Sequence, residues 1–286
     1  MANILTLKRR ITAAKNVSKT TKAMQMIAAS KLKKAQDAVS ASRPYVSKIS
    51  EIMNNLLEES KKSYTHPYLK SNSTTDKTLL LVLSPDKGLC GSLITNLIKE
   101  FLRYQEITPE TTYVVVGKKL EGQIVHFSSE IVASFPFGTT LPKFDRVYPL
   151  IKIIEDYYGT GKVSSVKILT AEYTSLFTQT PKIVPLLPIS PVQEESKEIK
   201  SDDFYLFEPG KKVLLDSLIN HYLEMTLYLQ LIESYLSEQA ARMMSMQNAT
   251  SNANDIIDAL QLEYNKTRQA KITSEILDIT GAQLYG

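Results

Sequence analysis

Between Lys211 and Thr280 the chain has 70 consecutive residues without a glycine or a proline. Both residue types interrupt helices, so their absence over this length predicts one continuous helix. Such a helix would be about 105 Å long at ~1.5 Å per residue, which is longer than any compact domain. A second element must therefore run beside it and cover its apolar side.

The apolar residues of this stretch are spaced by three and four positions, which places them on one side of a helix and predicts a coiled-coil seam. They are Leu215, Ile219, Tyr222, Met225, Leu229, Ile232 and Leu236. The N-terminal region has the same spacing, at Ile4, Leu7, Ile11, Ala14, Val17, Met24, Ala28, Leu32, Ala35 and Val39. Pro44 is expected to kink this helix. Further apolar residues indicate that it then continues, namely Ile49, Ile52, Met53, Leu56 and Leu57.

Charge supports pairing of the two helices. From Met1 to Arg43 there are ten basic residues and one acid, a net charge of +9, whereas Lys211 to Gly286 carry six basic and nine acidic residues, a net charge of −3. Opposite charges on facing helices favour association, although each surface pair contributes little. We therefore expect residues 1–60 and 208–286 to form a long antiparallel two-helix coiled coil.

The middle of the chain is rich in turn residues. Eight of the ten glycines lie between Gly88 and Gly210, and every proline except Pro44 lies between Pro67 and Pro209. Here β-branched or leucine-rich runs alternate with segments of helical spacing, which predicts a Rossmann-like α/β domain over residues 76–205 with a mostly parallel sheet. Strands are expected at Thr78–Ser84, Thr112–Gly117 and Val166–Tyr173, helices at Leu93–Tyr104 and Phe144–Tyr158, and a proline-rich edge strand within IVPLLPISP, Ile183–Pro191.

Two glycine-containing segments invite a search for nucleotide sites. In GTGK, Gly159 to Lys162, a P-loop would need a glycine and a Ser or Thr where the chain has Asp156 and Val163. The segment SPDKGLCGS, Ser84 to Ser92, follows a strand and precedes a helix, but it lacks the Rossmann glycine spacing. We interpret the first as a turn and the second as a loop that lets a strand and a helix pack closely.

The sequence offers no set of residues for catalysis or metal binding. His66, His126 and His221 are not at metal-ligand spacing from each other or from Cys90, and no serine lies in a G-x-S-x-G motif. We therefore predict no catalytic, cofactor-binding or metal-binding residues and no direct nucleotide binding. The single cysteine cannot form an internal disulfide and favours a reducing compartment. No segment approaches the ~18 to 20 apolar residues of a membrane span.

The stretch SKTTKAMQMIAASKLKKAQ, Ser18 to Gln36, combines five lysines and no acid with an apolar strip. The region before Pro44 has no Phe, Tyr or Trp, which disfavours both nucleic-acid stacking and anchoring in a membrane surface. Methionine and alanine form an adaptable surface, which favours a protein partner. A coiled-coil seam with solvated lysines would explain part of the pattern. A mitochondrial transit peptide is also basic and amphipathic, but here the pattern continues past any plausible cleavage point.

These segments resemble the gamma-subunit family of F-type ATP synthases. SPDKGLCGS is similar to that family's first strand, loop and helix, and the resemblance spans the chain in the family's order. The N-terminal helix is represented by LKRRITAAKNVSKTTKAMQMIAASKLKKAQ, Leu7–Gln36. The C-terminal helix and its entry are represented by YLFEP, Tyr205–Pro209, SEQAARMMSMQNATSNA, Ser237–Ala253, and YNKTRQAKITSEILDI, Tyr264–Ile279.

The resemblance implies a non-catalytic central-stalk subunit that transmits torque between a membrane ring of c subunits and a hexamer of three alpha and three beta subunits. Proton flow would thereby be coupled to ATP synthesis or hydrolysis. Implied partners are the alpha, beta and epsilon subunits and the c-ring, at the cytoplasmic face of a bacterial cell membrane. Contacts with the beta subunit are implied at Lys22, Met24, Lys31, Lys33, Lys34, Arg268, Gln269 and Thr273.

The C-terminal tip departs from the family pattern. Only Ile279 and Thr280 separate Asp278 from the closing Gly281-Ala282, one residue fewer than the family usually has. On an α-helix this rotates the following residues by about 100°, so the resemblance is not extended beyond Asp278. Three alternatives remain open: the rotor of a specialised F1-like ATPase, an α/β enzyme with a coiled-coil dimerisation arm, and a basic coiled-coil scaffold for nucleic acid.

Overall fold

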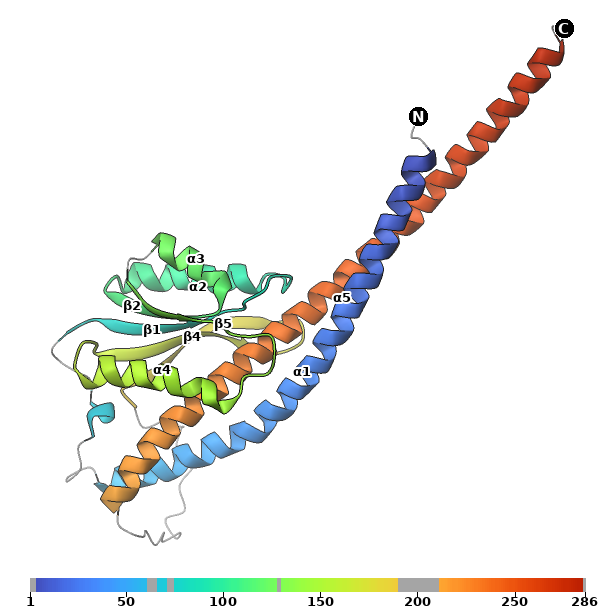
Figure 1. The fold of residues 1–286 in the computed structure, drawn as a ribbon. Helices are drawn as coiled ribbons and strands as arrows, with labels where there is room; N and C mark the ends of the chain where they lie inside the picture. Colours follow the sequence, from blue (N-terminus) through green and yellow to red (C-terminus); the bar gives the residue numbers. More distant parts are fainter. Residues whose placement is uncertain (1–3, 61–65, 71–74, 128–129, 190–210, 285–286) are drawn as a thin grey trace. The chain divides into compact units, whose positions relative to one another are not determined.

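The computed structural model describes residues 4–60, 66–70, 75–127, 130–189 and 211–284. The chain divides into two compact units, a coil unit of residues 1–29 and 242–286 and an α/β unit of residues 30–241. Both contain parts of two long helices, α1 (Ile4–Ser60) and α5 (Lys211–Leu284) (Figure 1). The predicted helix over the glycine- and proline-free stretch is therefore confirmed. The YLFEP segment lies outside the described residues.

In the coil unit, α1 and α5 run antiparallel, as predicted. Ser18 Oγ donates to Asn254 Oδ1 at 2.8 Å, and the hydroxyl oxygens of Thr21 and Thr250 lie 2.8 Å apart, so numbering rises on one helix as it falls on the other. The buried and half-buried positions alternate by three and four residues, as a coiled-coil seam requires. They include Ile4, Leu7, Ile11, Ala14, Ser18, Thr21 and Ala28 on α1, and Met246, Thr250, Ala253, Ile257, Leu260, Tyr264 and Thr267 on α5.

The prediction that Val17 belongs to this seam is wrong. Its side chain is 52% exposed, and the polar neighbour Ser18 takes the seam position. The step of four residues from Ala14 to Ser18 preserves the alternation, and the hydrogen bond to Asn254 satisfies the hydroxyl group. The helical spacing therefore determines the seam position more strongly than the apolar character of the side chain. A polar side chain that has a hydrogen-bond partner loses little free energy when it is half-buried.

The α/β unit contains a five-stranded sheet with the strand order β3-β2-β1-β4-β5. Strand β1 pairs in parallel with β2 and β4, β2 pairs in parallel with β3, and only β5 is antiparallel to its neighbour, which confirms the mostly parallel sheet. The proline-containing strand β5 lies at an edge, as predicted. The strands are β1 (Thr78–Leu83), β2 (Thr111–Val116), β3 (Ile131–Phe135), β4 (Ser165–Tyr173) and β5 (Gln179–Leu187).

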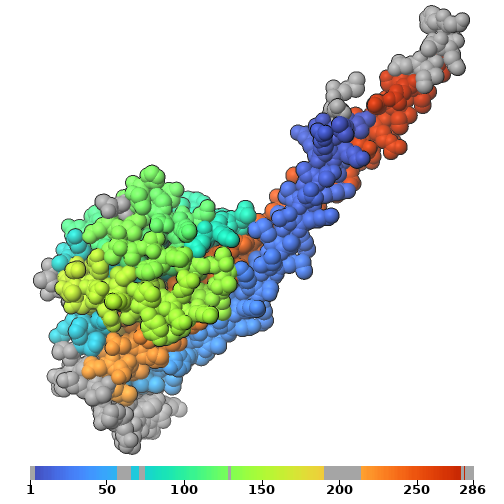
Figure 2. Space-filling view, in the orientation of Figure 1, coloured from blue at the N-terminus to red at the C-terminus, as the bar shows by residue number. Residues whose placement is uncertain are grey.

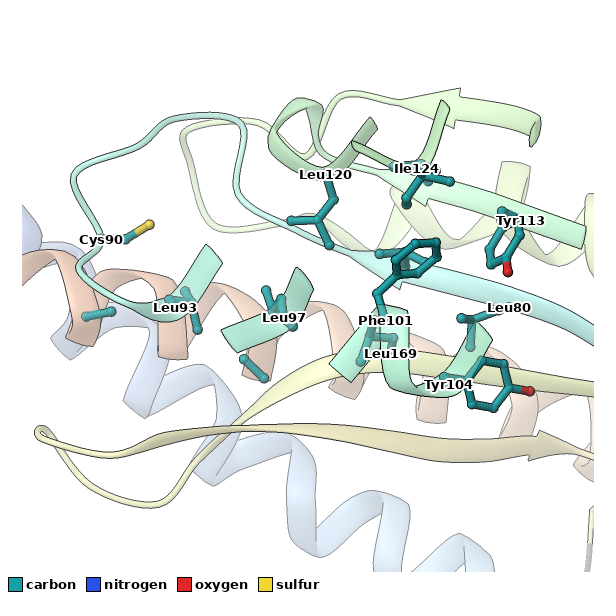
Figure 3. Close-up of a cluster of buried hydrophobic side chains, with 14 residues drawn as sticks. Leu80, Cys90, Leu93, Leu97, Phe101, Tyr104, Tyr113, Leu120, Ile124 and Leu169 are labelled. Carbon is teal, nitrogen blue, oxygen red and sulfur yellow. The ribbon is translucent and has the colours of Figure 1, made fainter. Parts of the chain in front are cut away.

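Helices cover both faces of the sheet (Figure 1). Helices α2 (Leu93–Ile107) and α3 (Lys118–Phe127) lie on one face, and α4 (Val147–Ile154) lies on the other. Two short 3₁₀ helices (Pro67–Leu69 and Phe144–Arg146) and a π-helical turn (Glu155–Gly159) complete the unit. The GTGK segment forms the turn between that last element and β4, as predicted. Figure 3 shows side chains from α2 and α3 packed against those of β1 and β2. The rings of Phe101 and Tyr113 are in edge-to-face contact, with their centroids 5.4 Å apart.

Within the α/β unit, α5 is more deeply enclosed than a two-helix seam would require. Every residue from 231 to 241 is buried, because the sheet domain packs against this part of the helix in addition to α1. Tyr222, Met225 and Leu229, predicted as seam residues, are only half-buried, whereas Leu223, Leu227 and Leu231 are buried.

Polar side chains in the enclosed part of α5 have partners on both sides. Ser237 Oγ donates to the carbonyl oxygen of Ala171 in β4 at 2.7 Å. Glu233 accepts from Arg43 of α1, with an N–O distance of 2.7 Å. Helix α1 contains Pro44 and continues to Ser60. The prediction that the helix continues after this proline is therefore confirmed.

Candidate functional site

The eight residues implied by resemblance fall in two separate units. Lys22, Met24, Arg268, Gln269 and Thr273 belong to the coil unit, and Lys31, Lys33 and Lys34 belong to the α/β unit. All except Met24 and Lys31 have exposed side chains, and these two are half-buried. Within each unit, these residues therefore lie along the outside of a helix rather than in an enclosed pocket.

The apolar strip of α1 divides into two groups. Ala28, Leu32 and Ala35 are buried at seam positions, whereas Met26 is 65% and Ile27 is 57% exposed. The seam therefore accounts for only part of the strip. Met26 and Ile27 present bulky apolar side chains beside lysines, a combination that suits contact with another protein.

Pairing in the coil unit ends near Arg268. Since Ser18 faces Asn254, counting 14 residues outward along both helices places Ile4, where α1 begins, opposite about residue 268. Among the described residues no helix lies beside α5 beyond this point, and in Figure 2 the red end of α5 extends past the blue start of α1. Its apolar side chains are exposed there, with Ile272 at 42%, Ile276 at 56% and Leu277 at 64%.

Two of the coil-unit residues implied by resemblance form bonds within their own helix. Lys22 Nζ donates to Gln25 Oε1 at 3.3 Å, and Thr273 Oγ1 donates to the carbonyl oxygen of Gln269 at 2.9 Å. These bonds are formed within single helices at the surface. Such groups are available to a partner because exchanging a solvated local bond for an intermolecular one costs little.

Lys31 differs from its neighbours because it is used inside the chain. Its Nζ donates to the carbonyl oxygen of Thr139 at 2.5 Å, and the same oxygen accepts from the Tyr235 hydroxyl at 3.3 Å. The loop carbonyl is thus bonded by both α1 and α5. Lys33, in contrast, forms a solvent-exposed ion pair with Asp37 at 2.9 Å, and Lys34 is exposed. Of the three lysines, Lys33 and Lys34 are the ones open to a partner.

Asp86 is a structurally important residue that the sequence argument did not identify. Its carboxylate accepts hydrogen bonds from the backbone N–H groups of Lys118 (3.0 Å), Phe137 (3.1 Å) and Gly138 (2.7 Å). These groups lie at the carboxyl ends of β1, β2 and β3, where open α/β sheets bind ligands. The first N–H of α3, which could have served a phosphate, is thus occupied by the chain's own carboxylate. The only sequence signal is an acid directly after a strand and proline.

Asp86 should make stability depend on pH. Burial raises the pKa of its carboxyl group, but the backbone bonds from Gly138, Phe137 and Lys118, with the charge of Lys118, outweigh burial and place the pKa below 3.8. A lowered folded-state pKa gives stabilisation that is present above pH ~4 and is lost as the pH falls through the folded-state value.

We expect Asp86→Asn to lower the free energy of unfolding by about 1–2 kcal/mol at pH 7, because a neutral amide replaces a carboxylate that accepts three backbone bonds. Urea denaturation at pH 7 and pH 3 measures the difference. The difference in the free energy of unfolding between the variant and the parent should be smaller at pH 3 than at pH 7. A gap that stays constant across this range would contradict the proposed contribution of the ionised carboxylate.

The described residues contain no group of three or more His, Cys, Asp or Glu side chains arranged to hold a metal ion. Within the same part of the chain, no helix has the length and apolar character needed to cross a membrane. Cys90 forms no disulfide, and its side chain is buried in the core cluster with Leu93 and Leu97 of α2.

A family model described as ATP synthase matches residues 3–283. The chain is 34% identical over 285 residues to the ATP synthase gamma chain of Legionella pneumophila, 36% over 286 residues to that of Nitrosococcus oceani and 37% over 286 residues to that of Dehalococcoides mccartyi. In each case 98% of both chains is covered.

Solved structures share the fold. The central stalk and c-ring structure of the Tetrahymena thermophila mitochondrial ATP synthase includes a chain that matches with a TM-score of 0.59 and 22% identity, covering 80% of this chain and 99% of that one. A chain from the rotor of the Euglena gracilis mitochondrial ATP synthase matches with a TM-score of 0.53 and 16% identity, covering 88% and 99%.

Proposed function

The chain belongs to the ATP synthase gamma-chain family, and from this premise we propose how it acts as the central stalk of an F1Fo ATP synthase. In that role it transmits torque between a membrane c-ring and the alpha3-beta3 hexamer, and so couples proton flow to ATP synthesis or hydrolysis. The observation that carries the proposal is a two-helix coil whose longer helix continues past the start of the other, with apolar side chains exposed and no other helix of the described residues beside it.

We propose that the coil unit, together with the part of α1 around Lys33 and Lys34, contacts the alpha and beta subunits, and that the sheet of the α/β unit and its covering helices contact the epsilon subunit and the c-ring. The unpaired tip supports the first assignment, because Ile272, Ile276 and Leu277 need an apolar environment that the described chain does not supply. Such a subunit would be peripheral, on the cytoplasmic face of a bacterial membrane. It would be non-catalytic, with ATP bound by its partners.

The basic surface of α1 is proposed to face acidic surfaces of the beta subunit. Complementary charge attracts over a distance and tolerates changes in geometry, as a rotating contact requires. Lys22, Lys33 and Lys34 would supply the charge, and Met26 and Ile27 would supply apolar contact that slides without a fixed hydrogen-bond register. On α5, Arg268, Gln269 and Thr273 are exposed and are proposed as polar contacts near the tip.

Reconstitution tests the proposed function directly. Purified alpha and beta subunits of the same organism are mixed with the chain, and complex formation and ATP hydrolysis are measured. A stable complex with one copy of the chain per alpha3-beta3 hexamer and sustained hydrolysis is expected. If the chain neither joins the hexamer nor changes its hydrolysis, the stalk assignment is wrong. An enzyme or a nucleic-acid scaffold of this fold would give that second result.

Within this system, Lys34→Glu should weaken assembly about tenfold at low ionic strength, because it places an acid where complementary positive charge is proposed. The difference should largely disappear above about 0.5 M salt, since exposed charges are screened. Titration of alpha3-beta3 with fluorescently labelled chain gives the affinity.

Lys31→Gln is the matched control for Lys34→Glu. It removes the bond to Thr139 and should lower the free energy of unfolding of the chain by about 1 kcal/mol. Its effect on the salt dependence of the affinity for alpha3-beta3 should be smaller than that of Lys34→Glu. Equal low-salt affinities of Lys34→Glu and the parent chain would place Lys34 outside the contact.

A further inference from the structure

The α/β unit contains an apolar cavity of about 120 Å³ beside a single arginine, and we infer that it is a binding site for a small aromatic carboxylate. The cavity lies at the carboxyl ends of β2 and β3, between these strands, α4 and α5. Its walls include Val116, Phe135, Phe137, Leu150 and Leu231, with Arg146 at one side. This site is separate from the helix surface proposed for the beta subunit, and the inference does not depend on that proposal.

The size of the cavity fits one aromatic ring. An apolar cavity of about 150 Å³ stays dry and takes up benzene, so a space somewhat smaller suits a single ring without large substituents. Water gains little there, because the lining is mainly aliphatic, aromatic and proline side chains. Two of the lining side chains, Phe135 and Phe137, can make offset or edge contacts with a bound ring.

Arg146 gives the site its charge preference. One guanidinium nitrogen, Nη1, donates to the carbonyl oxygen of Pro136 at 3.0 Å, which holds the side chain at the cavity wall. None of the ion pairs found among the described residues includes Arg146. Nearby Gly138 has no side chain, and a Cβ there would lie 3.8 Å from Nη2, so this nitrogen stays uncovered on that side.

A cation beside an apolar cavity favours a ligand that has both an apolar part and a negative charge. A hydrocarbon would fill the space but leave the guanidinium without an anionic partner, and inorganic phosphate would pair with the guanidinium but leave the cavity empty. A carboxylate on a ring satisfies both, since it can form a charge-assisted bond with the arginine while the ring is removed from water. Benzoate is the simplest such compound.

A bound ligand would stabilise a loop that is hydrogen-bonded to both long helices. The loop from Pro136 to Lys143 accepts bonds from Lys31 of α1 and from Tyr235 and Tyr228 of α5, and its N–H groups bind Asp86. A ligand packed against Phe137 and held by Arg146 would add a further link between this loop, α4 and α5. Binding should therefore slow local opening of this region.

Ligand-observed NMR on the full chain with benzoate as the probe tests the inference. Benzoate should bind the parent chain. Arg146→Gln should weaken it at least tenfold, while Arg146→Lys, which keeps the charge, should weaken it less than about threefold. Neutral benzyl alcohol should bind the parent and Arg146→Gln equally. Leu150→Phe, which fills the cavity, should abolish binding of both probes, and circular dichroism confirms that each variant is folded.

Several outcomes would overturn the inference. Benzoate binding that survives Leu150→Phe would place the ligand elsewhere. An unchanged benzoate affinity in Arg146→Gln would remove the role of the guanidinium, and this surface variant remains informative if Leu150→Phe fails to fold. Absence of benzoate binding to the parent chain at 10 mM would remove the site. Acetate binding as tightly as benzoate would show that the ring contributes nothing.

Discussion

Replacing Gly117 by alanine is expected to lower the free energy of unfolding of the α/β unit by about 3–5 kcal/mol. Gly117 follows β2 with φ of +105°, a conformation that side chains rarely adopt, and a Cβ at this position would lie 1.8 Å from the carbonyl oxygen of Ser84. That oxygen cannot move away easily. The backbone N–H of Ser84 donates to the carbonyl oxygen of Val116 at 2.8 Å, and its Oγ donates to the carbonyl oxygen of Gly117 at 2.9 Å. The backbone N–H of Gly117 donates to the carbonyl oxygen of Phe135 at 2.8 Å.

Gly122→Ala is the matched control. Gly122 lies inside α3, and a Cβ there would meet nothing within 4 Å, so the substitution should be neutral or stabilise by up to about 1 kcal/mol through helix propensity. Urea denaturation monitored by circular dichroism compares the two variants. If Gly117→Ala unfolds at the same urea concentration as the parent, the close approach of the β1 and β2 ends does not exist in solution.

The sequence was most informative where one pattern extends over many residues. The absence of helix-breaking residues from Lys211 to Thr280 predicted α5, and the buried apolar runs predicted β1, β2 and β4 to within one residue at each end. It was less informative for short or half-exposed elements. Helix α3 has ten residues and an internal glycine, and β3 has five residues of which none is fully buried, so neither shows a strong period.

The missed features of the site depend on contacts between distant residues. Asp86 is bonded to groups 32, 51 and 52 positions away, and Lys31 to an oxygen 108 positions away. Local spacing carries no information about such pairs. For the same reason the lysines of α1 are equivalent in the sequence pattern, although Lys31 donates to the loop that contains Thr139 and Lys34 is exposed.

The largest effect of assembly is expected at the unpaired tip of α5. From about residue 269 to Leu284 the helix has roughly four turns, and no helix within the described ranges lies beside it. A helix of this length is only marginally stable alone in water. The amide hydrogens of Ile272, Ile276 and Ile279 should therefore exchange quickly in the isolated chain. In the assembled complex, where partner residues are proposed to surround the tip, exchange should slow by about 100-fold or more. Hydrogen exchange measured by mass spectrometry on both samples gives the ratio.

The paired part of the same helix is the internal control for this measurement. Ala253 and Ile257 lie in the seam opposite α1 and are buried in the chain alone, so their amides should be protected in both samples, with a much smaller change on assembly.

Deleting Leu277 to Gly286 should weaken retention of the chain in the complex and lower turnover without altering urea denaturation of the α/β unit, which contains none of these residues. Equal protection of the tip in the free and assembled chain would mean that it packs within its own chain. The rotor mechanism would then lose its principal contact, because an already covered helix end has no apolar surface left for the hexamer to bind.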